Sequence, residues 1–372
     1  MIKRFIGIGI ILFWPIIAIS QWLNISEISI RPIQTEYGGP LIEISYTLND
    51  EELNENQPAY VFIHYSKDKG NTWQLINPEF LQGEGYDIVG SPGKKTVLFW
   101  GSGEIGINNP EIRIRGLLMA RIPAGEFKMR SFPGSGKDPF ITERPDTHLP
   151  EYYIAVNETT ILMYADYLNE MGKEGAGWNE RMANKRLCGI IRTGTEGNYS
   201  YEVLPGRENY PVIYVSWYDA YAFLRWCGLT IPSEAMFEKA FVGGIFLDGD
   251  KTGEIKNPIP ERKYPWGNEA PGQGGIYRCN FDREEDGFLN LAPVGSFSDF
   301  PSPYGINDLA GNVAEWTLNW YTTTYHVGLD GFRMVRGGSW LARPIACDAV
   351  SGATQFPIRE SSIMGFRGVK VK

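Results

Sequence analysis

Residues 307–316 read NDLAGNVAEW, and two further strings follow them, RMVRGGSW at 333–340 and MGFR at 364–367. Four strings precede them: ARIPAGEFKM at 120–129, YYI at 152–154 with NETT at 157–160, YPVIYVSW at 210–217, and IPSEAMFE at 231–238. No single string is decisive, but their order along the chain is. With 43 Gly, 24 Pro and 13% aromatic residues, the composition indicates a turn-dense fold held by aromatic anchors rather than long helices.

In this order the seven strings resemble the motifs of the formylglycine-generating, or sulfatase-modifying-factor, family. The resemblance runs from residue 120 to the C-terminus, about two-thirds of the chain, and departs from the family pattern at Arg130, where the family has Gly. It implies a formylglycine-generating-enzyme-like domain at residues 117–372, with a C-type-lectin-like fold and little regular secondary structure.

Three helices are expected in this domain. The first spans about residues 161–171. Ser216, followed by Asp219, forms a capping-box variant at the start of the second, and apolar residues then recur at helical spacing at positions 220, 223, 224 and 227. Ser233 offers a hydroxyl N-cap for the third helix.

Residues 21–116 predict an all-β sandwich of the immunoglobulin or fibronectin kind, which places the chain in the α+β class. The runs VFIHY (61–65) and KTVLFW (95–100) are rich in strand-forming residues, and EIRIR (111–115) alternates strictly. The string SKDKGNTW (66–73) resembles the Asp-box hairpin of sialidase propellers, in which Asp and Gly form the turn while Thr and Trp return the chain to the core. It occurs once, so the sequence predicts a stable hairpin and no propeller.

Residues 1–20 predict a signal peptide. Lys3 and Arg4 precede an uncharged apolar run from Phe5 to Ile19, and small residues before Gln21 suit a cleavage site. The run is shorter than the roughly 20 residues of a membrane span, so no retained transmembrane helix is expected. We therefore expect an exported protein that is periplasmic, exposed on the outer surface or secreted. A net charge of −9 argues against nucleic acid as a partner.

The four cysteines are Cys188, Cys227, Cys279 and Cys347, and none belongs to a C-x-x-C pair. Export makes disulfides possible, and four cysteines allow three connectivities among which the sequence does not choose. With three histidines and no H-E-x-x-H string, no zinc site is expected.

Two groups of oxygen ligands are candidate calcium sites. Calcium takes six to eight oxygens from carboxylates, amides and backbone carbonyls. The family resemblance implies one site at Asn280, Phe281, Asp286 and Phe288, and a second at Asp308, Gly311 (carbonyl), Val313 (carbonyl) and Glu315. Such ions would be structural. The alternative for the first group is a turn with solvated acids. For the second, Asp308 would cap a turn and Glu315 would pair with an arginine such as Arg333.

The resemblance also identifies where catalysis would occur. Catalytic family members hold copper(I) between two cysteines, two and seven residues after the aromatic of a G-G-S-Y segment, and oxidise a substrate cysteine to formylglycine. Here the aromatic is Trp340; Cys347 occupies the second position, but Ala342 replaces the other cysteine. Ala314 also replaces a tryptophan of the family pattern. One thiolate does not make a two-coordinate copper site, and Cys188, Cys227 and Cys279 are not expected to approach it through the fold, so copper is not expected. Cys347 is expected to be a buried small hydrophobe or half of a disulfide. Ser339 lies in a family active-site position without a Ser-His-Asp order, and it is expected to hydrogen-bond locally.

The main interpretation is an exported, non-catalytic binding or structural protein of the cell envelope, for example in a secretion or gliding machinery, with a protein or glycan partner. The segment 341–363 is its expected recognition surface, with candidate contacts Arg343, Asp348, Gln355, Phe356, Arg359 and Glu360. The alternative is a formylglycine-generating-type oxidase or a related oxidoreductase. The presence or absence of both family cysteines distinguishes the two interpretations, and the missing one at Ala342 favours binding.

Overall fold

The structure, a computed structural model, describes residues 22–34, 40–100, 110–130, 147–282, 284–320 and 331–371. The expected signal peptide lies outside these residues. Within them, no helix has both the length and the apolar character needed to cross a bilayer. In this part of the chain short strands predominate over three α-helices, which confirms the mixed α+β class.

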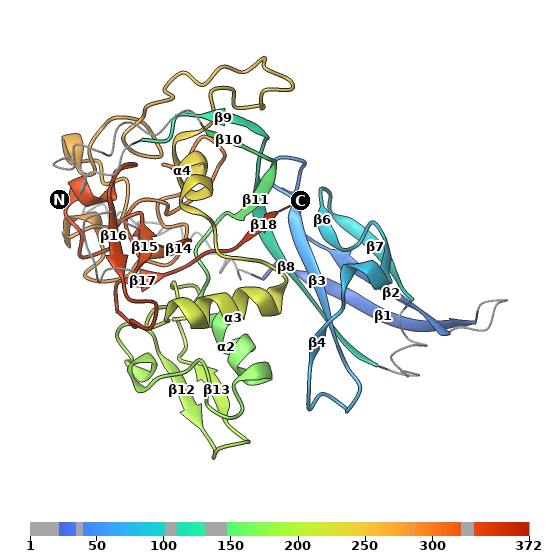
Figure 1. Cartoon of the computed structure of the whole chain (residues 1–372). Helices are drawn as coiled ribbons and strands as arrows, with labels where there is room; N and C mark the ends of the chain where they lie inside the picture. The colour runs from blue at the N-terminus through green and yellow to red at the C-terminus, as the bar shows by residue number, and fades with distance from the viewer. Residues whose placement is uncertain are drawn as a thin grey trace, which may run out of the picture.

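The N-terminal part consists of two sheets that enclose an apolar core (Figure 1). One sheet has the order β1-β2-β7-β5, and the other contains β3, β4, β6 and β8. Ile44, Tyr46 and Val97 from the first sheet pack against Val61 and Ile63 from the second. This two-layer packing agrees with the strand pattern, whereas the immunoglobulin or fibronectin subtype stays a prediction. The strands are β1 (Ile25–Gln34), β2 (Pro40–Leu48), β3 (Ala59–Ser66), β4 (Gln74–Leu75), β5 (Leu81–Gly83), β6 (Asp87–Val89), β7 (Gly93–Phe99) and β8 (Glu111–Ile122), with a 3₁₀ turn η1 (Pro78–Phe80).

Strand β8 belongs to both parts of the molecule. Its residues Glu111–Leu118 pair with β3, and its residues Met119–Ile122 pair with β11 (Tyr152–Ala155). Strand β18 (Val369–Val371) adds to the far side of β11, so the C-terminal end of the chain completes the same sheet. The expected domain boundary at residues 116–117 therefore falls inside a continuous strand.

The three helices form where the sequence predicts them, and Ser216 and Ser233 have the capping roles expected of them. Helix α2 (Ile161–Met171) has Thr160 as its N-cap. Helix α3 (Trp217–Cys227) begins with the full Ser216–Asp219 capping box, and its apolar positions 220, 223, 224 and 227 are buried. Helix α4 (Glu234–Val242) is capped by Ser233. The remaining elements are β9 (Gly125–Phe127), β10 (Thr147–Leu149), β12 (Ile190–Thr193), β13 (Ser200–Val203), β14 (Ala314–Trp320), β15 (Arg333–Arg336), β16 (Gly352–Gln355), β17 (Met364–Gly365) and the 3₁₀ turns η3 (Glu180–Ala183), η4 (Gln273–Gly275), η5 (Glu284–Asp286) and η6 (Pro344–Cys347).

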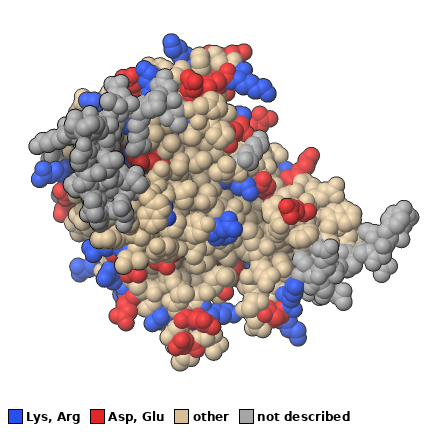
Figure 2. Space-filling model, viewed as in Figure 1, with Lys and Arg blue, Asp and Glu red and all other residues tan. Residues whose placement is uncertain are grey.

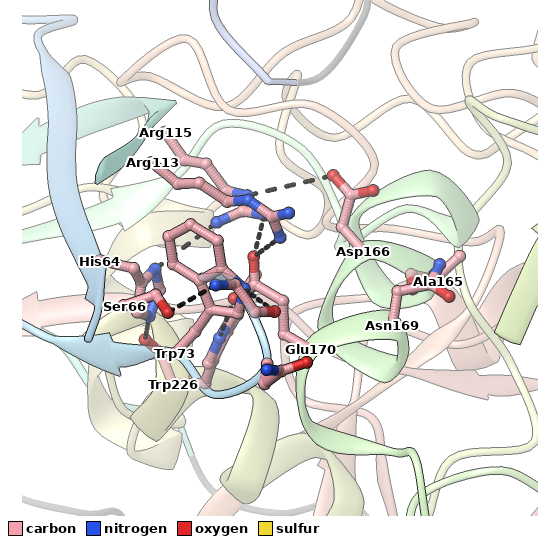
Figure 3. A network of polar contacts seen from close by, with 12 residues as sticks. His64, Ser66, Trp73, Arg113, Arg115, Ala165, Asp166, Asn169, Glu170 and Trp226 are labelled. Carbon is pink, nitrogen blue, oxygen red and sulfur yellow. Dashed lines mark hydrogen bonds and ion pairs between the residues drawn. The ribbon is translucent and has the colours of Figure 1, made fainter. Parts of the chain in front are cut away.

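An ionic and aromatic network around the buried Glu170 joins β8 to helices α2 and α3. Figure 3 shows Arg113 and Arg115 pointing together toward Glu170 of α2; their guanidinium nitrogens lie 2.5 and 2.6 Å from its carboxylate. The Trp226 indole donates to the other carboxylate oxygen over 3.0 Å, and the Arg115 guanidinium lies 4.8 Å from that ring. His64 stacks on the same indole with ring centroids 4.9 Å apart. These contacts fix the N-terminal sheets against the helices.

The 66–73 string forms the expected hairpin between β3 and β4. The Asp68 carboxylate accepts hydrogen bonds from the Thr72 N–H and hydroxyl and from the Ser66 hydroxyl, which lower its pKa to about 2. Gly70 has a φ of +81°, and the Trp73 indole is buried under the Arg113 guanidinium. The hairpin thus has a structural role at the junction.

Candidate functional site

The 307–316 string forms a tightly turned loop that leads into the sheet β16-β15-β14-β17. Asp308 and Asn312 have positive φ angles of 54° and 56°, and Gly311 has 82°. A Cβ on Gly311 would lie 2.2 Å from the Asn280 carbonyl oxygen, so only glycine lets the two segments approach this closely. The loop therefore brings the two candidate calcium groups next to each other.

Arg367 organises the carboxylates of this loop. Its guanidinium binds both oxygens of Glu315, at 2.7 to 2.9 Å, and also donates to the carbonyls of Ala155, Val156 and Asn307. The alternative that Glu315 pairs with an arginine is thereby seen in the structure, although the partner is Arg367. Arg333 instead lies between the rings of Trp217 and Trp320.

Two more buried carboxyls share this environment. The Glu158 carboxyl accepts from the Asn312 amide and the Val313 N–H, and Asp308 accepts from the Gly295 N–H. Burial raises the pKa of Asp308 to about 6 and the pKa of Glu158 well above its usual range, and neighbouring carboxylates add to both shifts. Arg367 already neutralises the Glu315 carboxylate. Glu315 therefore does not fit its predicted role as a cation ligand in the second group.

The first group fits a cation better. The Asn280 side-chain oxygen is buried and has no hydrogen-bond partner among the described residues, and a cation supplies what such an atom lacks. The Asn280 amide nitrogen donates to the Asn290 carbonyl over 2.8 Å, which fixes the direction of the side chain. Asp286 is held nearby, because its carboxylate accepts from the N–H groups of Phe281 and Phe288. Among the described residues no three His, Cys, Asp or Glu side chains gather as a metal site, so a cation here would need amide and carbonyl oxygens besides the Asp286 carboxylate.

At the positions where catalytic family members hold copper, Ser339 and Cys347 are buried, whereas Trp340 and Ala342 are half-buried. Ser339 is 3% exposed, which excludes it as an accessible nucleophile in this conformation. Cys347 ends the η6 turn and is fully buried, and Ala342 packs against the same apolar cluster.

Sequence reasoning missed a second thiol beside Cys347. Cys279 lies in the same apolar cluster as Cys347, and the two residues are 2% and 0% exposed. Burial, followed by the neighbouring Cys347, raises the pKa of Cys279 well above its usual range. Copper(I) needs thiolates and a substrate needs access, so this enclosed pair does not fit a copper-oxidase site. No local sequence signal could have found the pair, because the two residues meet only through the fold.

The expected recognition segment is largely at the surface. Phe356, Arg359 and Glu360 line a hollow of about 270 Å³ together with Arg181 and Ile358. Phe356 also packs on Phe332, with ring centroids 4.0 Å apart.

The other three candidate contacts do not line this hollow. Arg343 is exposed at the start of η6. Asp348 accepts from the N–H groups of Val350 and Ser351, a local turn role, and Gln355 ends β16.

Four exposed apolar side chains lie on this segment, and sequence reasoning missed three of them. Leu341, Ile345, Phe356 and Ile358 are 50%, 72%, 54% and 74% exposed. Only Phe356 was among the predicted contacts, because the sequence pattern does not reveal which apolar residues of an irregular loop face solvent.

Comparison with known proteins identifies the family to which residues 109–372 are similar. The family model described as sulfatase-modifying factor enzyme 1-like domain matches residues 109–372. A formylglycine-generating enzyme from Streptomyces coelicolor is 29% identical over 296 residues, covering 66% of this chain and 87% of that protein. An inactive C-alpha-formylglycine-generating enzyme 2 from Mus musculus is 35% identical over 159 residues, covering 42% of this chain and 44% of that protein. The solved structure of PvdO from Pseudomonas aeruginosa matches with a TM-score of 0.45 and 20% identity, covering 68% of this chain and 93% of that one. The chain thus belongs to the sulfatase-modifying factor enzyme 1-like family.

Proposed function

We propose that this protein is an exported, non-catalytic member of its family that binds a protein or glycan partner of the cell envelope through the segment 341–363. The observation that carries the proposal is a contrast within one region. The residues at the family's active-site positions, Ser339 and Cys347, are buried, whereas apolar side chains a few positions away are exposed. An exposed apolar group beside charged residues is typical of a surface that binds a partner.

The surroundings of the hollow support recognition rather than catalysis. Arg359 is exposed, and Glu360 lies 3.9 Å from the Arg181 guanidinium. Ile358 and Phe356 thus have charged neighbours of both signs, which gives a partner apolar area as well as hydrogen-bonding groups. On the face shown in Figure 2, the Lys and Arg side chains drawn in blue lie scattered among the red Asp and Glu side chains. Nucleic acid is therefore not the proposed partner.

A structural calcium ion at Asn280, Phe281, Asp286 and Phe288 completes the proposal. The unpartnered Asn280 oxygen favours it. Its role would be to brace a loop, since the Asn312 N–H donates to the Asn280 carbonyl over 2.9 Å and the Trp340 N–H donates to the Asn312 carbonyl over 2.8 Å. An ion at this place would stabilise the base of the recognition segment.

A retention experiment with matched variants tests the binding function. Three proteins are immobilised and exposed to an envelope extract: the wild type, the double variant Phe356→Ser/Ile358→Ser and the control Ile255→Ser. The control changes an exposed apolar residue outside the segment. The wild type and the control should retain the same component, and the double variant should lose at least tenfold. Protease or periodate treatment of the extract then distinguishes a protein from a glycan. Equal retention by all three proteins would contradict the assignment of the surface.

A further inference from the structure

Two of the four cysteines are neighbours in the interior, although they lie far apart in the sequence. Cys279 and Cys347 share one apolar cluster, and both are almost completely buried. Cys188 and Cys227 belong to a different cluster. The structure therefore favours the pair 279–347 over any pair that joins the two clusters.

Backbone hydrogen bonds hold the two segments in place. The Asp282 N–H donates to the Ala342 carbonyl over 3.0 Å, which ties the chain after Cys279 to the loop before Cys347. The Ala346 N–H donates to the Arg343 carbonyl over 2.8 Å inside the η6 turn. A Cβ on Gly338 would lie 2.8 Å from the Cys347 sulfur, so the backbone at Gly338 also confines that side chain. The backbone hydrogen bonds therefore hold the two segments that carry Cys279 and Cys347 next to the same apolar cluster.

We propose that Cys279 and Cys347 form a disulfide bond when the chain folds in the presence of a small-molecule disulfide. One cysteine thiolate attacks the reagent and forms a mixed disulfide with release of one reagent thiol. The second cysteine thiolate then displaces the other reagent thiol, so the protein loses two hydrogen atoms and the reagent disulfide is reduced to two thiols. The bond links the loop of the Asn280 group to the base of the segment 341–363. It does not depend on what that segment binds.

The burial of the pair determines when the exchange takes place. Both residues are enclosed in the folded protein, so a small-molecule disulfide has no access to either sulfur there. The bond should therefore form before the segment 341–363 has packed, and it should resist reduction afterwards.

Peptide mass spectrometry tests the pairing directly. The full chain is unfolded, reduced, refolded with and without a mixture of oxidised and reduced glutathione, alkylated under denaturing conditions and digested with trypsin. The four cysteines fall on different tryptic peptides, with Cys279 in residues 279–283 and Cys347 in residues 337–359. We expect these two peptides to be cross-linked, about 2 Da below the sum of their reduced masses, while Cys188 and Cys227 are alkylated. Alkylation of all four cysteines, or a cross-link between any other pair, would overturn the proposal.

A stability comparison gives a second readout. A native disulfide that closes a loop of this length should raise the melting temperature by on the order of 10 °C relative to protein refolded without the glutathione mixture. Cys279→Ala and Cys347→Ala should each abolish this difference, and the control Cys188→Ala, also fully buried, should keep it. The same difference in all three variants would also overturn the proposal.

Discussion

Arg367 is the residue on which the interior of the C-terminal domain depends most. It is fully buried, and its guanidinium satisfies both oxygens of Glu315 and three backbone carbonyls at once. Burial alone would lower its pKa, but the adjacent Glu315 carboxylate leads the groups that raise it. A planar group with five donors is suited to this position, and a lysine would not replace it.

Removing this guanidinium should be strongly destabilising. Arg367→Met leaves the buried Glu315 carboxylate without its cation, and breaking a buried pair in this way costs about 3–5 kcal/mol of unfolding free energy. Urea unfolding of the purified variant measures the loss. Arg359→Met, which changes an exposed arginine, should alter the stability by less than about 0.5 kcal/mol. A similar small effect for both variants would contradict this role of Arg367.

The lowered pKa of the buried His64 should make the stability of the protein depend on pH. Burial lowers its pKa from 6.5 to about 4, and Arg115 contributes in the same direction, although Glu170 opposes the shift. The unfolded state therefore takes up a proton below about pH 6.5 while the folded state does so only near pH 4, so stability falls as the pH drops across this window.

The free energy of unfolding that His64 removes at low pH is roughly 3 kcal/mol at most. Asp308, with a pKa of about 6, acts in the opposite sense, so the measurement compares the wild type with His64→Gln between pH 7 and pH 4.5. The stability advantage of the wild type should shrink as the pH falls. An advantage that does not change with pH would show that His64 is not held neutral.

At the scale of elements, the loop of Asn280 and Asp286 is where an ion would act. Calcium should raise the melting temperature by a few degrees and a chelator should reverse the gain, because binding stabilises the folded state by mass action. Asn280→Ala should remove the response, and Asn290→Ala should keep it, since Asn290 contributes its backbone carbonyl to the Asn280 amide. A wild-type melting temperature that does not respond to calcium or chelator would contradict the site.

The elements themselves were largely predictable. Local hydrogen bonds and apolar spacing suffice to place the helices, which are capped by Thr160, Ser216 and Ser233. Contacts between distant segments were not predictable in this way. The family motifs indicated the Glu315 region, but its pairing with Arg367 and the contact of Cys279 with Cys347 arise only when loops from different parts of the sequence pack together.

At the scale of the whole molecule, the network at Glu170 makes the N-terminal sheets and the C-terminal domain one stable unit. In Glu170→Ala, the Arg115 guanidinium would keep the Asp166 carboxylate, 4.0 Å away, as its ionic partner. The Trp226 indole N–H would lose its hydrogen-bond acceptor. We expect a loss of about 3 kcal/mol in urea unfolding. The control Glu174→Ala changes an exposed residue just beyond the same helix and should be nearly neutral. Equal stability of the two variants would show that the junction does not depend on this network.

The most direct test of the non-catalytic assignment is a mass measurement. A cysteine-containing peptide of the sulfatase type is incubated with the purified protein, copper(I) and oxygen, beside an active formylglycine-generating enzyme as control. We expect the control to convert the peptide cysteine to an aldehyde and this protein to leave it unchanged, because Ala342 replaces one cysteine and the remaining pair is buried. Formation of the aldehyde by this protein would contradict the central claim and would identify the chain as an oxidase.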